Sequence, residues 1–328
     1  MPNRQLIDPQ GRKLSYLRVS VTDRCNFRCA YCYSNADTPL DDKELLKDDE
    51  IIKLINVFVK LGINKVRLTG GEPLLRKNVV KLVEKIADIE SIKLIGLTTN
   101  GYLLKFHLQP LIDAGINRLN VSLDTLKRDV FESLTGQDGL FRVIEAIDIA
   151  EKSGAFPFVK VNTLLIKGLN DTEIGDFADW ALKRKIDLRF IEFMPTKCSE
   201  WDETKFVQES DLRNILKYEL VPDYENEDIN SPARSYKVEG YPGRISFISA
   251  MSRSFCQTCS RLRLTSDGKL LGCLFGKRDI DLRQPLSQNM TVNEIAEHVQ
   301  RMISLEGFRQ IPSEKGAVYQ PAMKSIGG

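Results

Sequence analysis

Val-Thr-Asp-Arg-Cys-Asn-Phe-Arg-Cys-Ala-Tyr-Cys, residues 21–32, carries three cysteines at the spacing C-x3-C-x2-C. A closed structural metal site uses four protein ligands, so Cys25, Cys29 and Cys32 leave one coordination position for another molecule. Thiolates are the usual protein ligands of iron–sulfur clusters, and three of them can hold three corners of a 4Fe-4S cube. The stretch therefore predicts a 4Fe-4S cluster with one iron open to a small molecule.

Two other uses of these cysteines fit less well. A zinc site needs a fourth ligand, and the two histidines of the chain, His107 and His298, are far from the triplet in sequence. A redox pair formed by Cys29 and Cys32 would leave Cys25 unexplained. Both remain alternatives to the cluster.

The cysteine loop follows the first of six β-branched runs that alternate with amphipathic segments between about residues 15 and 195. The predicted strands are Leu17–Val21, Val66–Leu68, Leu94–Thr98, Arg118–Ser122, Val159–Leu165 and Leu188–Phe193. The clearest predicted helices start at Asp48 or Asp49 as N-cap and stop at Gly62, or run over Phe141–Ser153 and Thr172–Lys183. Because a closed barrel needs eight such units, we expect an α/β fold, an incomplete (βα)6 TIM-like barrel with parallel strands.

Polar clusters follow several of these strands. Gly70-Gly71 comes after the second, Asn100 after the third, Ser122 and Asp124 at the fourth, and Met194 after the sixth. In barrel-like folds, the carboxyl ends of the strands carry the active site. We expect a site at this rim, where the glycines allow a ligand to approach the backbone closely.

A second cysteine triplet lies near the C-terminus. Cys256 and Cys259 are separated by two residues, and Cys273 follows a predicted hairpin of 261–264 and 269–271 that could return it to the pair. The triplet again lacks a fourth ligand, and the alternative is an incomplete zinc ribbon. Cys198, in a polar stretch, is interpreted as a bystander thiol.

The domain division follows from a polar run at residues 223–232, which predicts an exposed linker. We expect a barrel domain over residues 1–222 and a smaller mixed C-terminal domain over residues 223–328, including a strand at Arg244–Ile248 and the second cysteine triplet. Taken alone, the terminal Gly327-Gly328 is typical of a frayed tail.

Composition excludes several classes of protein. Lys and Arg number 47 against 45 acidic residues, which argues against a protein that coats nucleic acid but leaves room for a local cationic pocket. No apolar run approaches the roughly 18 residues of a membrane span, and the N-terminus lacks an apolar signal core. The seven cysteines suit ligation in a reducing compartment, so we expect a cytoplasmic protein with no membrane partner.

At these residues the chain resembles the radical S-adenosylmethionine (SAM) superfamily, through the first triplet with Tyr31 and the run Gly70-Gly71-Glu72-Pro73. The resemblance implies that the open iron of the first cluster binds SAM. It further implies a SAM pocket formed by Tyr31, Gly71, Ser122 and Met194.

With the second triplet and the run Arg261-Leu262-Arg263, the chain resembles the GTP 3′,8-cyclase family of molybdenum-cofactor biosynthesis. The resemblance implies a second 4Fe-4S cluster whose open iron meets guanine. The candidate GTP contacts are Arg18, Arg67, Thr98, Lys160, Arg189, Arg261, Leu262 and Arg263. Arg261, Arg263, Gly327 and Gly328 are the candidate catalytic residues.

The reaction implied by this resemblance is a lyase-type cyclisation. A 5′-deoxyadenosyl radical removes the hydrogen at C3′ of GTP, and the C3′ radical attacks C8 to give 3′,8-cyclo-7,8-dihydro-GTP. The implied partners are an electron donor such as flavodoxin or ferredoxin and, for product hand-over, cyclic pyranopterin monophosphate synthase. A homodimer is a further expectation.

The chain departs from the family pattern at Tyr33-Ser34, usually Met-Pro, and at Ser260, usually Asn. Neither change removes a ligand cysteine. Two alternatives stay open at this point. One is another radical SAM enzyme with an auxiliary cluster, such as one that modifies peptides, and the other is a non-catalytic zinc or redox-sensing protein.

Overall fold

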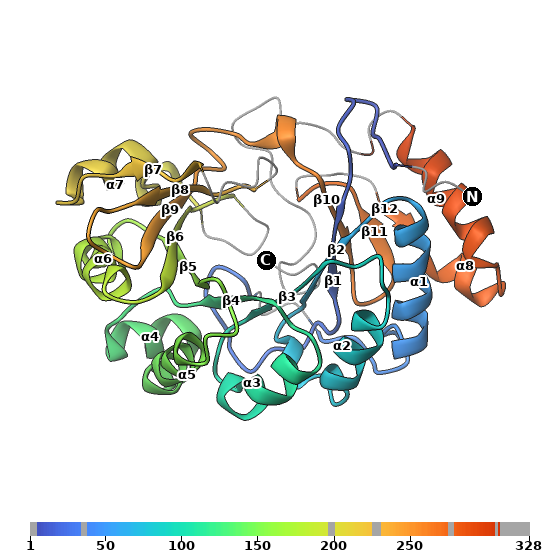
Figure 1. The fold of residues 1–328 in the computed structure, drawn as a ribbon, viewed down its shortest axis with the longest axis horizontal. Coiled ribbons are helices and arrows are strands. Elements are labelled where there is room, and N and C mark those ends of the chain that lie inside the picture. The colour runs from blue at the N-terminus through green and yellow to red at the C-terminus, as the bar shows by residue number, and fades with distance from the viewer. Residues whose placement is uncertain are drawn as a thin grey trace.

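The computed structural model describes residues 5–33, 38–195, 201–224, 231–274, 279–305 and 308. Within these ranges, twelve strands form one curved sheet in the order β12-β11-β10-β1-β2-β3-β4-β5-β6-β9-β8-β7 (Figure 1). The strands are β1 Tyr16–Ser20, β2 Lys65–Thr69, β3 Leu94–Thr99, β4 Arg118–Ser122, β5 Val159–Leu165, β6 Ile186–Glu192, β7 Val221–Pro222, β8 Arg234–Lys237, β9 Arg244–Ile248, β10 Arg261–Leu264, β11 Lys269–Leu271 and β12 Asp279–Asp281.

Helices cover the outer face of the sheet (Figure 1). They are α1 Asp48–Lys60, α2 Val79–Ala87, α3 Leu104–Asp113, α4 Arg128–Thr135, α5 Leu140–Lys152, α6 Ile174–Leu182, α7 Glu209–Ile215, α8 Arg283–Ser287 and α9 Val292–Ile303. In α1, for example, Ile51, Leu54, Ile55 and Phe58 are fully buried because their spacing places them on one helical face. No helix in the described ranges is long and apolar enough to cross a membrane.

The predicted strands and the open parallel barrel are confirmed. β1 to β6 pair in parallel and in chain order, and each matches its predicted run to within two residues. The sequence did not predict that C-terminal strands continue this sheet at both edges. β10 pairs in parallel with β1, and β9 pairs in parallel with β6.

This strand order determines where residues 249–260 run. β9 lies at one edge of the eight parallel strands and β10 lies at the other, so the connection between them crosses the open side of the barrel (Figure 1). That connection carries Cys256 and Cys259. The open side of the barrel is therefore lined by the second cysteine loop.

Two local predictions are wrong. The N-cap of α1 is Lys47, because the Glu50 carboxylate accepts a hydrogen bond from the Lys47 backbone N–H (2.7 Å) and Asp48 becomes the first helical residue. Asp223 is not exposed but 2% accessible, because its carboxylate pairs with Arg244 and Lys237. Residues 225–230 of the predicted linker lie outside the described ranges, and the division at residues 222 and 223 stays a prediction.

Candidate active site

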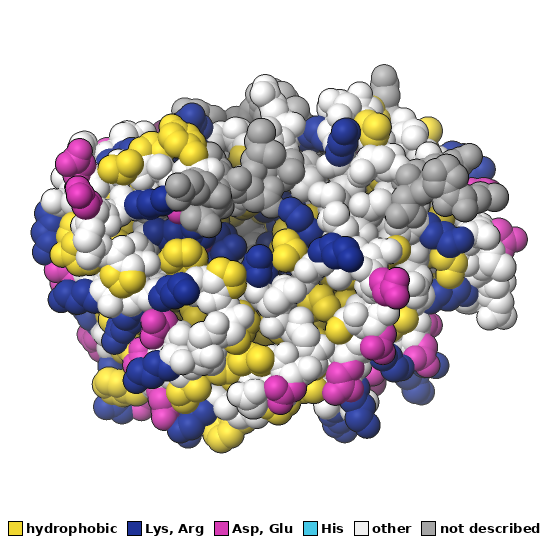
Figure 2. Space-filling view, viewed as in Figure 1, with side chains coloured by type: hydrophobic (Ala, Val, Ile, Leu, Met, Phe, Trp, Pro, Cys, Tyr) yellow, Lys and Arg dark blue, Asp and Glu magenta, His cyan; other side chains and the backbone are white. Residues whose placement is uncertain are grey.

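A cavity of about 390 Å³ occupies the interior of the barrel. Figure 2 shows Lys and Arg side chains gathered around the hollow in this face of the molecule. Ten cationic residues line the cavity, and its described lining contains no Asp or Glu. They are Arg12, Arg18, Lys65, Arg67, Arg118, Lys160, Arg189, Arg244, Arg261 and Arg263. An ordinary barrel interior is packed with branched apolar side chains, so this lining indicates a chamber for an anion.

Strand register produces one part of this charge. Arg18 on β1 is paired with Arg263 on β10 and with Arg67 on β2, so three arginines form a row across neighbouring strands. The outward-facing neighbours Leu17 and Val19 are fully buried against the helices. Because side chains alternate along a strand, burying these apolar residues outside turns the arginines inward.

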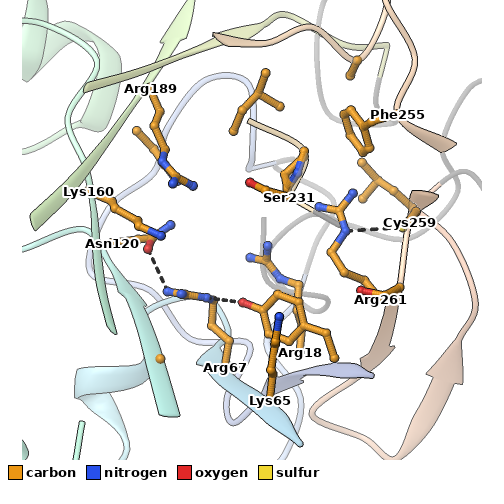
Figure 3. A pocket seen from close by; sticks show the side chains of 18 of the residues that line it. Arg18, Lys65, Arg67, Asn120, Lys160, Arg189, Ser231, Phe255, Cys259 and Arg261 are labelled. Carbon is orange, nitrogen blue, oxygen red and sulfur yellow. Dashed lines mark hydrogen bonds between the residues drawn. The ribbon is translucent and has the colours of Figure 1, made fainter. Parts of the chain in front are cut away.

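Arg67 is held rigidly in this row. Its Nε lies 2.5 Å from the Tyr16 hydroxyl, and its Nη1 donates to the Leu97 carbonyl (2.8 Å). The same Nη1 also donates to Asn120 Oδ1 (2.9 Å), as Figure 3 shows. Gly96 faces Arg67 on β3, and a Cβ there would lie 2.7 Å from the guanidinium carbon. The absence of a side chain at Gly96 therefore makes room for Arg67.

The cations disturb one another. Burial, and then the charges of Arg263 and Arg67, lower the pKa of Arg18 well below its usual value. On the opposite wall, the charge of Arg189, followed by burial, lowers the pKa of Lys160 in the same direction. A bound anion would relieve this repulsion, so the electrostatics favour a polyanionic ligand.

The second cysteine loop forms another wall of the same cavity. Cys256, Cys259 and Cys273 all line it, as the predicted return of the hairpin requires. Arg261 donates from Nε to the Cys259 sulfur (3.4 Å), and its guanidinium stacks over Phe255 at 4.9 Å (Figure 3). Cation and thiols thus meet at the edge of the chamber.

The first cysteine loop lies against the carboxyl ends of β1 and β2. The Phe27 N–H (3.4 Å) and Asn100 Nδ2 (3.8 Å) donate to the Cys25 sulfur. Burial raises the pKa of the Cys25 thiol to about 11, and burial with the neighbouring charges of Cys32 and Asp124 raises the pKa of Cys29 well above its usual value. Without a nearby cation, these three neighbouring thiols are unfavourable to ionise. An iron–sulfur group would supply the positive charge that stabilises them as thiolates.

Gly70 and Gly71 lie directly against the first cysteine loop. A Cβ on Gly70 would lie 2.3 Å from the Thr22 carbonyl oxygen, and one on Gly71 would lie 2.3 Å from that of Arg24. The Gly71 N–H also donates to Thr22 O (2.8 Å). These glycines therefore let the cysteine loop itself approach the end of β2.

Among the described residues, no three His, Cys, Asp or Glu side chains are arranged to hold a single metal ion.

The structure brings together most of the residues proposed from sequence. Of the candidate GTP contacts, the cavity is lined by Arg18, Arg67, Lys160, Arg189, Arg261 and Arg263. Thr98 and Leu262 do not line it, and the Leu262 side chain is buried in the core, so only its backbone can face a ligand. Gly327, Gly328, Cys198 and Ser34 lie outside the described residues.

The candidate SAM residues divide between two places. Tyr31 and Ser122 line a small pocket with Cys29, next to the first cysteine loop. Met194 lines the large cavity, and Gly71 packs against the loop. The Tyr31 hydroxyl donates to Asp124 (2.6 Å), which holds the ring at the pocket.

Sequence reasoning missed several cavity residues. They are Arg12, Tyr16, Lys65, Arg118, Asn120, Asn162 and Arg244. The available signal was alternation: Lys65 and Arg67, and likewise Arg118 and Asn120, stand two apart in a strand and so share its inner face.

Comparisons with known proteins agree with this arrangement. The model of the radical SAM superfamily matches residues 19–181, and a "Molybdenum Cofactor Synthesis C" model matches residues 186–307. The structure is similar to that of Streptococcus suis SuiB bound to S-adenosylmethionine, with a TM-score of 0.55 over 88% of this chain and 67% of that one. At 16% identity, that likeness shows the fold alone. The family match and the first cysteine loop together define a protein of the radical SAM superfamily.

Sequence relatives narrow the class. The chain is 40% identical over 326 residues to a GTP 3′,8-cyclase of Thermodesulfovibrio yellowstonii, covering 98% of this chain and 99% of the relative. It is 42% identical to molybdenum cofactor biosynthesis protein 1 of Dictyostelium discoideum over 89% of this chain but only 47% of the relative, so it spans about half the length of such relatives. The chain belongs to the GTP 3′,8-cyclase family.

Proposed function

We propose that this protein converts GTP to 3′,8-cyclo-7,8-dihydro-GTP by radical SAM chemistry, the first step of molybdenum-cofactor biosynthesis. The observation that carries the proposal is a single chamber lined by ten cations and by the second cysteine triplet. One wall offers phosphate contacts and another offers a cluster that can meet the base.

The charge of the chamber suits a nucleoside triphosphate. A triphosphate carries about four negative charges, and guanidinium groups contact phosphate oxygens in a bidentate manner. Arg18, Arg67 and Arg263 share one row, while Lys160 and Arg189 face them from β5 and β6. Cations on separate strands would therefore contact the triphosphate from two sides, which fixes the position of the attached ribose.

The cofactors proposed are SAM and two 4Fe-4S clusters. Cys25, Cys29 and Cys32 would hold the first, with SAM contacted by Tyr31, Gly71, Ser122 and Met194. Cys256, Cys259 and Cys273 would hold the second. When bound, the reduced first cluster with SAM supplies a 5′-deoxyadenosyl radical. The protein itself orients C3′ toward that radical and excludes water from the chamber.

The other assignments complete the proposal. Arg261 and Arg263 would couple the position of the triphosphate to that of guanine, since Arg261 also contacts the Cys259 sulfur. Gly327 and Gly328 would reach the active site. The expected setting is the cytoplasm, with a flavodoxin or ferredoxin as electron donor, product hand-over to cyclic pyranopterin monophosphate synthase, and a homodimer.

The deciding experiment is anaerobic incubation of the reconstituted, reduced enzyme with SAM and GTP. We expect 5′-deoxyadenosine and the cyclised nucleotide to form together. Deoxyadenosine formation that does not respond to GTP, without cyclised product, would favour a peptide-modifying enzyme. Stoichiometric zinc without the broad absorbance of iron–sulfur clusters would instead indicate a zinc protein.

Gly96→Ala is expected to weaken GTP binding about ten- to a hundredfold, because the new methyl group displaces the Arg67 guanidinium and a hydrogen bond to a charged group is lost. The displaced atoms belong to the end of a side chain and not to the backbone, so the fold should be retained. Calorimetric titration with GTP measures the effect, and thermal unfolding checks the fold.

Gly175→Ala is the matched control. Gly175 lies in α6 on the outside of the barrel, and nothing lies within 4 Å of the position its Cβ would occupy. Alanine is the better helix former by roughly 1 kcal/mol, so stability should be equal or slightly higher and GTP affinity unchanged. Equal GTP affinity in both variants would contradict the role assigned to Arg67.

A further inference from the structure

Asp187 on β6 is a fully buried carboxylate two residues before Arg189, on the same face of the strand. Its Oδ2 accepts hydrogen bonds from both Nε (2.9 Å) and Nη2 (2.7 Å) of Arg189. Its Oδ1 accepts a hydrogen bond from the Ser246 hydroxyl (2.6 Å) on β9. Two bonds to one edge of the Arg189 guanidinium fix the plane of that group, and two strands fix the carboxylate.

A second arginine braces the same carboxylate. Arg244 on β9 donates from Nη2 to Asp187 (3.1 Å) and from Nη1 to Asp223 (3.1 Å), and its guanidinium lies over the Phe158 ring at 4.1 Å. Both terminal nitrogens of Arg244 are therefore engaged by carboxylates. Arg244 therefore holds Asp187 in place. Arg189 contacts Asp187 through Nε and Nη2, so its Nη1 takes no part in that contact.

The orientation of Arg189 follows from this brace. Figure 3 shows its guanidinium turned into the cavity beside Lys160, on the wall opposite Arg261. Although burial works against it, the charges of Arg189, Arg244 and Lys160 hold the pKa of Asp187 below its usual value, so the carboxylate is ionised. An ionised acceptor makes the strong, short bonds that immobilise a guanidinium.

We propose that Asp187 is a positioning residue for the triphosphate: it holds the Arg189 guanidinium in the orientation that contacts phosphate, while Ser246 and Arg244 hold Asp187. The inference rests on the proposed function, because it needs a phosphate-bearing ligand in the chamber. It assigns no contact between Asp187 and the ligand.

A rival role for Asp187 predicts the opposite change in GTP affinity when its charge is removed. If Asp187 only offset the positive charge of the wall, removing its charge would raise the cavity potential and tighten the binding of GTP. If it positions Arg189, the same change frees that side chain, and the ordering of a long side chain must then accompany binding. Asp187→Asn distinguishes the two roles by the direction of the change.

The experiment titrates GTP and guanosine into the anaerobically reconstituted enzyme as wild type, Asp187→Asn, Arg189→Met and the double variant. We expect Asp187→Asn to weaken GTP binding about tenfold, with guanosine, which lacks phosphates, unaffected. In the Arg189→Met background, Asp187→Asn should have no further effect on GTP. A kcat near wild type at saturating GTP with a raised KM would agree.

Several outcomes overturn the proposal. Tighter GTP binding by Asp187→Asn would leave only the charge-offset role. Equal losses for GTP and guanosine would indicate general damage to the fold, and additive losses in the double variant would show that Asp187 does not act through Arg189. If the wild type binds GTP no better than guanosine, the proposed function fails first and the inference falls with it.

Two further variants guard against misfolding and nonspecific charge effects. Asp187→Glu keeps the charge but moves the carboxylate. A positioning role therefore predicts weaker GTP binding, whereas a charge-offset role predicts no change in GTP affinity. It replaces Asp187→Asn if that variant does not fold. Asp138→Asn is the control for charge removal. The Asp138 carboxylate likewise accepts two hydrogen bonds from one arginine, Arg128, but this pair lies on the outer surface, so GTP affinity should be unchanged.

Discussion

Replacing Cys29 with alanine is expected to abolish both 5′-deoxyadenosine formation and GTP cyclisation. Cys29 is the middle of three thiols on one short loop, and it packs against the core. Two remaining thiolates are too few to retain a cluster with one open iron. Iron analysis after anaerobic reconstitution should fall from about eight to about four irons per chain.

The matched control for this prediction is Cys198→Ser, which removes the thiol interpreted as a bystander. Iron content, deoxyadenosine and product should all equal the wild-type values. Full deoxyadenosine formation by Cys29→Ala would show that the first triplet is not the site of SAM cleavage. A loss in Cys198→Ser would show that the bystander interpretation is wrong.

Replacing Cys259 with alanine is expected to separate the two halves of the reaction. Cys259 lines the large cavity, next to Arg261 and away from the small pocket that contains Cys29 and Tyr31. SAM cleavage should therefore continue, while cyclised product falls below detection because guanine loses its proposed contact. Chromatography of deoxyadenosine and of the nucleotide from the same reaction measures both.

Arg261 provides a check on this separation. Its Nε hydrogen bond to the Cys259 sulfur is lost in Cys259→Ala, whereas the Arg18–Arg67 row is untouched. GTP affinity should fall but persist, since the phosphate contacts remain. Normal yields of cyclised product from Cys259→Ala would rule out the second cluster as a substrate site.

Much of the barrel could be predicted because its signals are local. Alternating β-branched runs, helical periodicity and stop residues depend on neighbours in the chain, and β1 to β6 accordingly match their predicted runs. The cysteine triplets could also be recognised, since ligand spacing within a loop is a property of a few adjacent residues. The burial of Asp223 could not be predicted, because it depends on Arg244, which lies on a later strand. The N-cap of α1 was missed although its signal is local, since Glu50 follows Lys47 by three residues.

The sequence by itself determined the order of the six barrel strands, the six candidate ligand cysteines and most of the cations of the chamber. Only the tertiary structure decided that β9 and β10 close onto opposite edges of the barrel, that Arg263, Arg18 and Arg67 share one register, and that Gly96 and Asp187 set the positions of two of the arginines. The physical reason is distance along the chain. The pairing and register of strands that are far apart in the chain are set by the packing of the whole core. No local sequence pattern encodes that packing.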